Sequence, residues 1–281
     1  EYRSWTDAFD VSWDGRARRV TVLGEPLDLV TSSGRYRGGV YDVPRLRLER
    51  LGGWLEASAR IGPRRRLHAE FRGADIPLHR LLDGAVAEYG LQAKAAIRGE
   101  VDGTLDDFTG RASATLSGTT LADQSLGEVA LDVFLEPSRR LRLVGGTEDG
   151  RLRLDAVADL DGRTRVGATL EFTDLEPLAF VADPRLAGYR LVTSGRTTLV
   201  AELGGTLEVE GKADLDTFVL ETPHGRVEAT EPVWLAFDQS GAEIRRGRFS
   251  APGGSQFTML GYAGKDRLAL DLQGTADLAL V

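Results

Sequence analysis

Hydrophobic and polar residues alternate along most of this chain. Between residues 151 and 156, for example, Leu152, Leu154 and Ala156 are separated by Arg153 and Asp155. Successive side chains of a β-strand point to opposite faces, so this pattern predicts strands with one apolar face and one solvated face. The same alternation recurs toward both ends of the chain and indicates about twenty strands.

Short turn sequences separate the alternating runs. Pairs such as Asp149-Gly150 and Asp161-Gly162, together with other glycines, recur about every 10 to 15 residues, which is typical of an antiparallel meander. The sequence therefore predicts an all-β fold. Open twisted sheets rarely exceed about ten strands without curling. We expect a long curled antiparallel sheet that bends over its apolar face as a closed barrel, a sandwich or an open groove.

Two segments interrupt the alternation and resemble each other. Residues 70–82 and 171–180 each contain Glu-Phe, then an acidic residue, an apolar residue and a proline. Asp75 and Asp174 are predicted to cap two short helices at about 76–88 and 175–186, with a proline in each first turn. The strands that follow also match, at an offset of roughly 100 residues. This repeat predicts two blocks, at about 70–170 and 171–281.

Composition narrows the class of protein. Hydrophobic residues make up 42% of the chain, the formal net charge is −8 and cysteine is absent. The negative charge argues against a nucleic-acid partner, and the lack of cysteine excludes disulfides and thiolate metal sites. No apolar run is long enough to span a membrane as a helix. The chain begins at Glu1 without a methionine or a signal peptide, so we expect residues 1–281 to be an interior fragment of a larger elongated protein.

The residues offer little chemistry. The three histidines, His68, His79 and His224, are too far apart in sequence for a metal-ligand spacing. There is no nucleophile elbow and no phosphate loop. We therefore expect no catalytic residue, no metal and no cofactor. A carbohydrate-active enzyme stays open as a minor alternative, because paired carboxylates in a cleft could act on a glycan.

Several phrases resemble a known family. The pattern of strand, Asp-Leu-x-Pro-Leu and short helix at residues 174–178 is similar to the AsmA-like and TamB-like proteins of Gram-negative envelopes. So are residues 213–220 and 274–280, and residues 224–238 are similar to TamB-like proteins in particular. The resemblance implies a folded, trough-like sheet, called a β-taco, with an apolar interior. It covers most of the chain from about residue 40 onward.

The resemblance also implies a function. Such proteins are anchored in the inner membrane, cross the periplasm and meet an outer-membrane barrel protein (TamA-like); here the anchor and the partner-binding region would lie outside this fragment. They are implicated in phospholipid transport to the outer membrane and in outer-membrane protein assembly. An apolar face could bind phospholipid acyl chains, at about 0.8 kcal/mol per buried methylene. Alternation alone favours an ordinary packed core, and it is the resemblance that favours a lipid-binding face. The alternative function is a structural or chaperone-like β-scaffold whose strand edges pair with nascent outer-membrane proteins.

On the lipid hypothesis, the predicted groove-lining residues are Leu152, Leu154, Val166, Ala168, Leu170, Leu207, Val209, Leu215, Leu268, Leu270, Leu272, Leu278 and Leu280.

Overall fold

The structure is a computed structural model that describes residues 9–22, 25–78, 90–121, 124–160, 164–180, 186, 188–204, 206–264 and 267–275. Nineteen strands belong to one hydrogen-bonded sheet, and the strand pairs are antiparallel. The prediction of an all-β fold on an antiparallel sheet is confirmed. The chain divides into two compact units, Glu1–Leu143 (unit 1) and Val144–Val281 (unit 2). The predicted repeat boundary at 170/171 falls inside a strand of unit 2.

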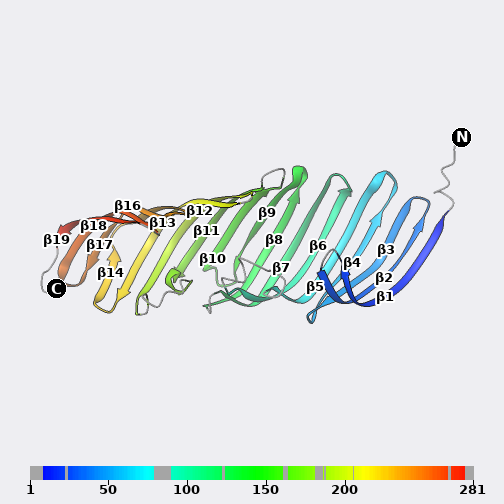
Figure 1. Cartoon of the computed structure of the whole chain (residues 1–281), viewed down its shortest axis with the longest axis horizontal. Coiled ribbons are helices and arrows are strands. Elements are labelled where there is room, and N and C mark those ends of the chain that lie inside the picture. Colours follow the sequence, from blue (N-terminus) through cyan, green and yellow to red (C-terminus); the bar gives the residue numbers. More distant parts are fainter. Residues whose placement is uncertain are drawn as a thin grey trace. The chain divides into compact units, whose positions relative to one another are not determined.

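Unit 1 is a meander in which each strand pairs with the next along the chain (Figure 1). Tight turns make this possible, for example Arg37-Gly38-Gly39-Val40, where both glycines have positive φ. Its strands are β1 (Asp10–Val22), β2 (Glu25–Arg37), β3 (Val40–Arg50), β4 (Gly53–Ile61), β5 (Arg66–Pro77), β6 (Gln92–Thr104), β7 (Phe108–Leu121) and β8 (Gln124–Glu136). Strand β9 (Arg140–Thr147) follows and contains the division between the units.

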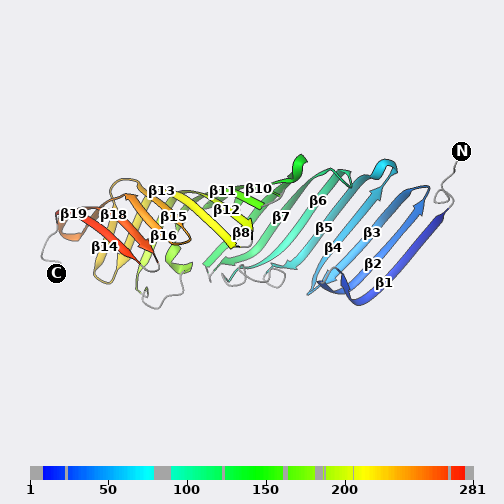
Figure 2. The same ribbon diagram turned by 45° about the horizontal axis from the view of Figure 1, so that its top comes forward.

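Unit 2 continues the antiparallel pattern, and its strands vary more in length than those of unit 1 (Figure 2). Its strands are β10 (Leu152–Asp159), β11 (Thr164–Leu175), β12 (Arg190–Gly204), β13 (Thr206–Thr222), β14 (Gly225–Ala229), β15 (Val233–Asp238), β16 (Gly241–Arg246), β17 (Arg248–Ala251), β18 (Ser255–Gly264) and β19 (Leu268–Thr275). The four short strands β14 to β17 are two interrupted strands, because β14 and β15 pair with the two halves of β13. Strands β17 and β16 pair in the same way with the two halves of β18.

A carboxylate bridges the two interruptions. Glu231 lies between β14 and β15 and accepts hydrogen bonds at 2.9 Å from both Arg246 and Arg248, which flank the break between β16 and β17. The hydrogen bond from Arg246, followed by the charge of Arg248, lowers the pKa of Glu231. The backbone N–H of Thr230 also donates to the carbonyl of Arg248 at 2.8 Å. Glu231 therefore ties together two strands where their ladder is broken.

The two predicted helices are corrected where the structure describes them. Residues 76 and 77 are the end of β5, and Leu175 is the end of β11, so the predicted helix starts are wrong. In the second segment a 3₁₀ turn, η5 (Pro177–Phe180), follows the strand. Residues 79–89 and 181–185 lie outside the described residues. Proline lacks an N–H and is tolerated at a strand end or in a bulge as well as in a first helical turn, so its presence did not decide between them.

Asp75 and Asp174 are also corrected, because neither is a helix cap. Both have positive φ, 55° and 51°, and each lies in a β-bulge where the strand register shifts. Aspartate tolerates the left-handed region better than most residues. The similarity that the sequence displays at these two places therefore corresponds to two bulged strand ends with the same backbone conformation.

Buried side chains form one small cluster in each unit. In unit 1 the cluster is Ala93, Ala95 and Leu116. In unit 2 it is larger and includes two phenylalanines; its members are Phe172, Ala213, Leu215, Val233 and Phe249. Most other apolar side chains of the described residues are only half-buried, because they lie on one face of a single sheet.

Candidate functional site

The strand registers of unit 2 bring the predicted lining residues onto one face of the sheet. Residues directly opposite each other in antiparallel strands point to the same face. Leu154 lies opposite Leu170, and Leu170 lies opposite Thr197. The same row continues through Ala213, Leu235, Ile244 and Gly261 to Leu270. On this face lie Leu152, Leu154, Val166, Ala168, Leu170, Val209, Leu215, Leu268, Leu270 and Leu272.

The structure does not describe the side chains of the other three predicted lining residues. Leu207 belongs to β13, but its side chain is not among the described ones, and Leu278 and Leu280 lie beyond the described residues. The lining role predicted for these three leucines stays a prediction. We call this face of the sheet, from β10 to β19, the apolar face of unit 2.

Exposure changes steeply across the apolar face of unit 2. Leu215 is 4% exposed and packs in the buried cluster, with Val233 at 1%. On β19, Leu268 is 71% exposed and Leu272 is 60% exposed. The cause is packing: the Phe249 ring lies against Phe218 at 5.4 Å and Phe257 at 5.6 Å between ring centroids. The face is thus filled near the phenylalanines and open at β19.

Unit 1 has an apolar face of its own, which the list of lining residues omitted. One row runs through Val30, Leu48, Leu55, Gly73 and Ile97, and it continues to Ala114 and Leu131. All of these except the buried Gly73 are half-buried. The signal that could have found them is the same alternation, which Leu46 with Leu48 and Leu55 with Ala57 already display. We call this row and its neighbours on the same side the apolar face of unit 1.

Both apolar faces use glycine beneath an aromatic ring. Phe71 lies opposite Gly99, where an added Cβ would come within 2.5 Å of the ring. Phe237 lies opposite Gly211 in unit 2, where the corresponding distance is 2.3 Å. A ring can lie across a neighbouring strand only where that strand has no side chain. The aromatic rings therefore lie low against the sheet.

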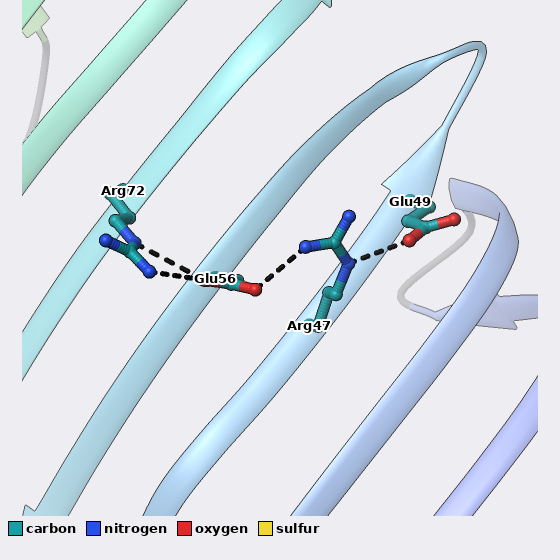
Figure 3. Close-up of polar contacts among 4 residues, drawn as sticks. All are labelled: Arg47, Glu49, Glu56 and Arg72. Atoms are coloured by element: carbon teal, nitrogen blue, oxygen red, sulfur yellow. Dashed lines mark hydrogen bonds and ion pairs between the residues drawn. The ribbon is translucent and has the colours of Figure 1, made fainter.

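The opposite face of unit 1 carries a ladder of charges across neighbouring strands. Arg47 on β3 donates to Glu56 on β4 at 2.8 Å and to Glu49 at 2.7 Å (Figure 3). Arg72 on β5 donates to the other oxygen of Glu56 at 2.9 Å. These hydrogen bonds, that of Arg47 first, lower the pKa of Glu56. The ladder keeps this face charged, in contrast to the apolar face on the other side of the same strands.

A hollow of about 1000 Å³ lies over this charged face. Its lining includes Glu56, Arg72, Arg98 and Asp132, and it extends from β3 to β8. Two smaller hollows lie in unit 2, and Glu210 and Asp238 line both. The hollow of about 460 Å³ is lined mainly by polar residues, and that of about 560 Å³ by polar and apolar residues in similar number. The polar face is therefore hollowed in both units, which the alternation alone did not predict.

The described residues contain little that could perform catalysis. His68 accepts or donates a hydrogen bond at 2.6 Å with Asp102, and this contact raises its pKa, but both side chains are more than half exposed. Among the described residues no group of three or more histidine, aspartate or glutamate side chains could hold a metal ion. No helix in the described part of the chain is both long and apolar enough to cross a membrane. His79 lies outside the described residues.

Comparison of the chain with protein-family models, with curated proteins and with solved structures finds no match.

Proposed function

We propose that this chain is a lipid-binding β-scaffold whose apolar faces bind the acyl chains of phospholipids. The observation that carries the proposal is the continuity of those faces. In unit 1 a row of apolar or glycine residues crosses seven consecutive strands, from Val30 on β2 to Leu131 on β8, and most of its side chains are half-buried. A protein that only needed a core would cover such a surface, since exposed apolar patches are costly in water.

The chemistry of the faces suits a flexible hydrocarbon. Their side chains are mainly Ala, Val, Leu and Ile with interspersed glycines, which offer a smooth wall with few hydrogen-bonding groups such as that of Thr197. Burial of each methylene contributes about 0.8 kcal/mol, so an acyl chain of ordinary length gains enough to bind without a specific polar contact. The charged ladder on the opposite side keeps the scaffold in water.

The proposal extends to where the scaffold acts. In keeping with the resemblance to the AsmA-like and TamB-like family, we propose that it belongs to a larger periplasmic protein anchored in the inner membrane. It would carry phospholipid toward the outer membrane, where an outer-membrane barrel protein would be its partner. The chain would work without catalysis or a cofactor.

Site-specific photo-crosslinking tests the lipid-binding face. Neighbouring residues on one strand point to opposite faces, so the chain supplies its own controls. We expect a photoreactive residue at Leu131 or Leu154 to capture phospholipid, and one at Asp132 or Arg153 to capture none. Native mass spectrometry of the purified chain should then detect bound phospholipid. Equal capture from both faces, or no capture at all, would contradict the proposal.

A second candidate function is strand-edge pairing with nascent outer-membrane proteins. It is favoured by β19, which pairs with β18 on one side and has no partner strand among the described residues on the other. Its apolar side chains Leu268 and Leu272 are exposed, and an unpaired edge with exposed leucines can accept another strand. Crosslinks from Ala269 to an unfolded barrel polypeptide, with none to lipid, would favour this function over lipid binding.

A further inference from the structure

One edge of unit 1 collects arginines and exposed aromatic residues. The connections β2–β3, β4–β5, β6–β7 and β8–β9 lie side by side along the upper edge of unit 1 in Figure 1. Their residues 37–41, 62–66, 104–108 and 136–140 carry six arginines and three carboxylates. This excess of positive charge contrasts with the net charge of −8 for the whole chain. We call these four connections the arginine edge.

Three of the four connections of the arginine edge are joined to one another. Arg65 on the β4–β5 connection forms an ion pair of 2.9 Å with Asp106 on the β6–β7 connection. The N–H of Leu105 donates to the carbonyl of Arg65 at 3.0 Å. Between the first two connections, Tyr41 lies opposite Ile61 in the strand register. The first three connections therefore form one surface with a defined arrangement.

Apolar side chains emerge beside the arginines. Tyr41 is 49% exposed, Phe108 is 41% exposed and Leu105 is 39% exposed. Tyr36 contacts Tyr41, with 4.6 Å between the ring centroids. Arginine beside exposed tyrosine and phenylalanine is the combination that favours the headgroup region of a bilayer, where cations meet phosphates and aromatic rings lie at the boundary with the acyl chains.

Three arginines of the edge have left-handed backbone conformations. Arg64 and Arg65 both have positive φ, 58° and 61°, and Arg139 has a φ of 55°. L-residues adopt this conformation at a cost that glycine does not incur. Arginine therefore occupies three exposed positions of the edge at which glycine would be less strained, although Arg19 and Leu51 adopt the same conformation elsewhere in unit 1.

We propose that the arginine edge docks unit 1 on the surface of a bilayer that contains anionic phospholipid. Arg37, Arg64 and Arg66 are exposed and would bind lipid phosphates, while Tyr41, Leu105 and Phe108 enter the headgroup layer. Rows of the apolar face end at this edge, at Ile61 and Leu67 on β4 and β5. The proposal deepens the proposed function, on which it rests, by naming the surface at which lipid enters or leaves the apolar face.

Vesicle flotation of the full chain tests this docking. We expect binding to phosphatidylcholine vesicles that contain phosphatidylglycerol, weaker binding to phosphatidylcholine alone, and loss of binding at high salt because exposed charges are screened. Changing Arg37, Arg64 and Arg66 to Gln should lower the vesicle partition coefficient roughly a hundredfold, since each arginine near the surface contributes about a factor of five. The matched control changes Arg16, Arg18 and Arg19 to Gln; this removes the same charge elsewhere in unit 1, and binding should persist.

The outcomes separate this proposal from the lipid-binding function. Equal loss in both triple variants, equal binding to neutral and anionic vesicles, or stronger retention of a single-stranded oligonucleotide than of vesicles would overturn the docking proposal. Native mass spectrometry of the edge variant provides the second measurement. If the edge variant loses vesicle binding but still carries phospholipid on its apolar face, both proposals stand. If the wild-type chain binds anionic vesicles through this edge yet never carries lipid, the docking stands and the proposed function fails.

Discussion

Units 1 and 2 are built from the same alternating strands, yet they bury their apolar residues to different extents. In unit 2 Phe249 and Val233 are almost completely buried, at 0% and 1% exposure. In unit 1 the buried cluster consists of two alanines and one leucine, and most of the other apolar side chains stay half-exposed. The difference comes from bulky rings and broken strands: phenylalanines gather where β14 and β17 replace half of a long strand pair. Unit 2 therefore combines a packed core with an open margin, and unit 1 is open over most of its face.

This comparison refines the proposed lipid-binding surface. Leu152, Leu170 and Leu215 belong to or contact the phenylalanine cluster, so part of the predicted lining in unit 2 stabilises the fold. The half-buried rows of unit 1 offer more accessible apolar area without such a cluster. On the proposed function, acyl chains should therefore occupy unit 1 more readily than the filled part of unit 2.

The largest expected effect is on the packed core of unit 2. Phe249→Ala should lower the free energy of unfolding by about 3–5 kcal/mol, because it removes a fully buried ring and leaves a cavity. Urea unfolding followed by circular dichroism measures the change. The control Leu272→Ala alters a side chain that is 60% exposed on the same face, and it should change stability by no more than about 0.5 kcal/mol. Similar losses in both variants would contradict the distinction between packed core and open margin.

A glycine beneath a ring should matter more than a glycine in open space. Gly99→Ala in unit 1 should destabilise by about 1–3 kcal/mol, because the added Cβ meets Phe71 and the carbonyl of Arg111. Gly167→Ala in unit 2 has no heavy atom within 4 Å of its Cβ position, and it should be neutral or stabilising by up to about 1 kcal/mol. Thermal unfolding of the two variants compares them. Equal effects would show that Phe71 moves aside readily.

Acid should weaken unit 2 at its first hairpin. The Thr147 hydroxyl, the Arg151 N–H and the Arg151 side chain all donate to Asp149 and lower its pKa to about 2. Because the folded pKa is below the ordinary value of 3.8, the carboxylate stabilises the fold fully above that value. This contribution is lost as the pH falls toward 2. In Asp149→Asn the stability should depend less on pH in this range, as urea unfolding at a series of pH values would detect. An unchanged pH dependence would be inconsistent with these hydrogen bonds.

The smallest expected effect is on a surface histidine of unit 1. The hydrogen bond with Asp102, then its charge and those of Glu70 and Glu100, raise the pKa of His68 above 6.5. Its charged form therefore stabilises the fold at low pH, and this contribution is lost as the pH rises through the folded pKa. Asp102→Asn should lower the His68 pKa toward 6.5, measured by the NMR shifts of the ring protons. Asp132→Asn is the control, and it should leave the pKa of His68 unchanged.

The alternation was sufficient to predict the strands and their two faces. Residues 152–156 alternate strictly, and Leu268, Leu270 and Leu272 fall on every second position. The registers place the apolar residues of the first run, and these three leucines, on one face, as the period of two requires. The candidate face in unit 1 could have been found by the same rule. The helices at 76–88 and 175–186 were wrong at their starts, because Asp followed by proline fits both a helix start and a bulged strand end.

What the sequence determined by itself is the all-β fold and the amphipathic character of each strand, since the direction of a side chain in a strand depends only on its position. What only the tertiary structure decided is where that apolar surface is filled and where it stays open. That depends on contacts between residues far apart in sequence: Phe249 against Phe218 and Phe257, Phe71 over Gly99, and Glu231 between Arg246 and Arg248. The clustering of arginines at one edge was equally hidden, because strand register brings together turns that the sequence holds some 25 to 40 residues apart.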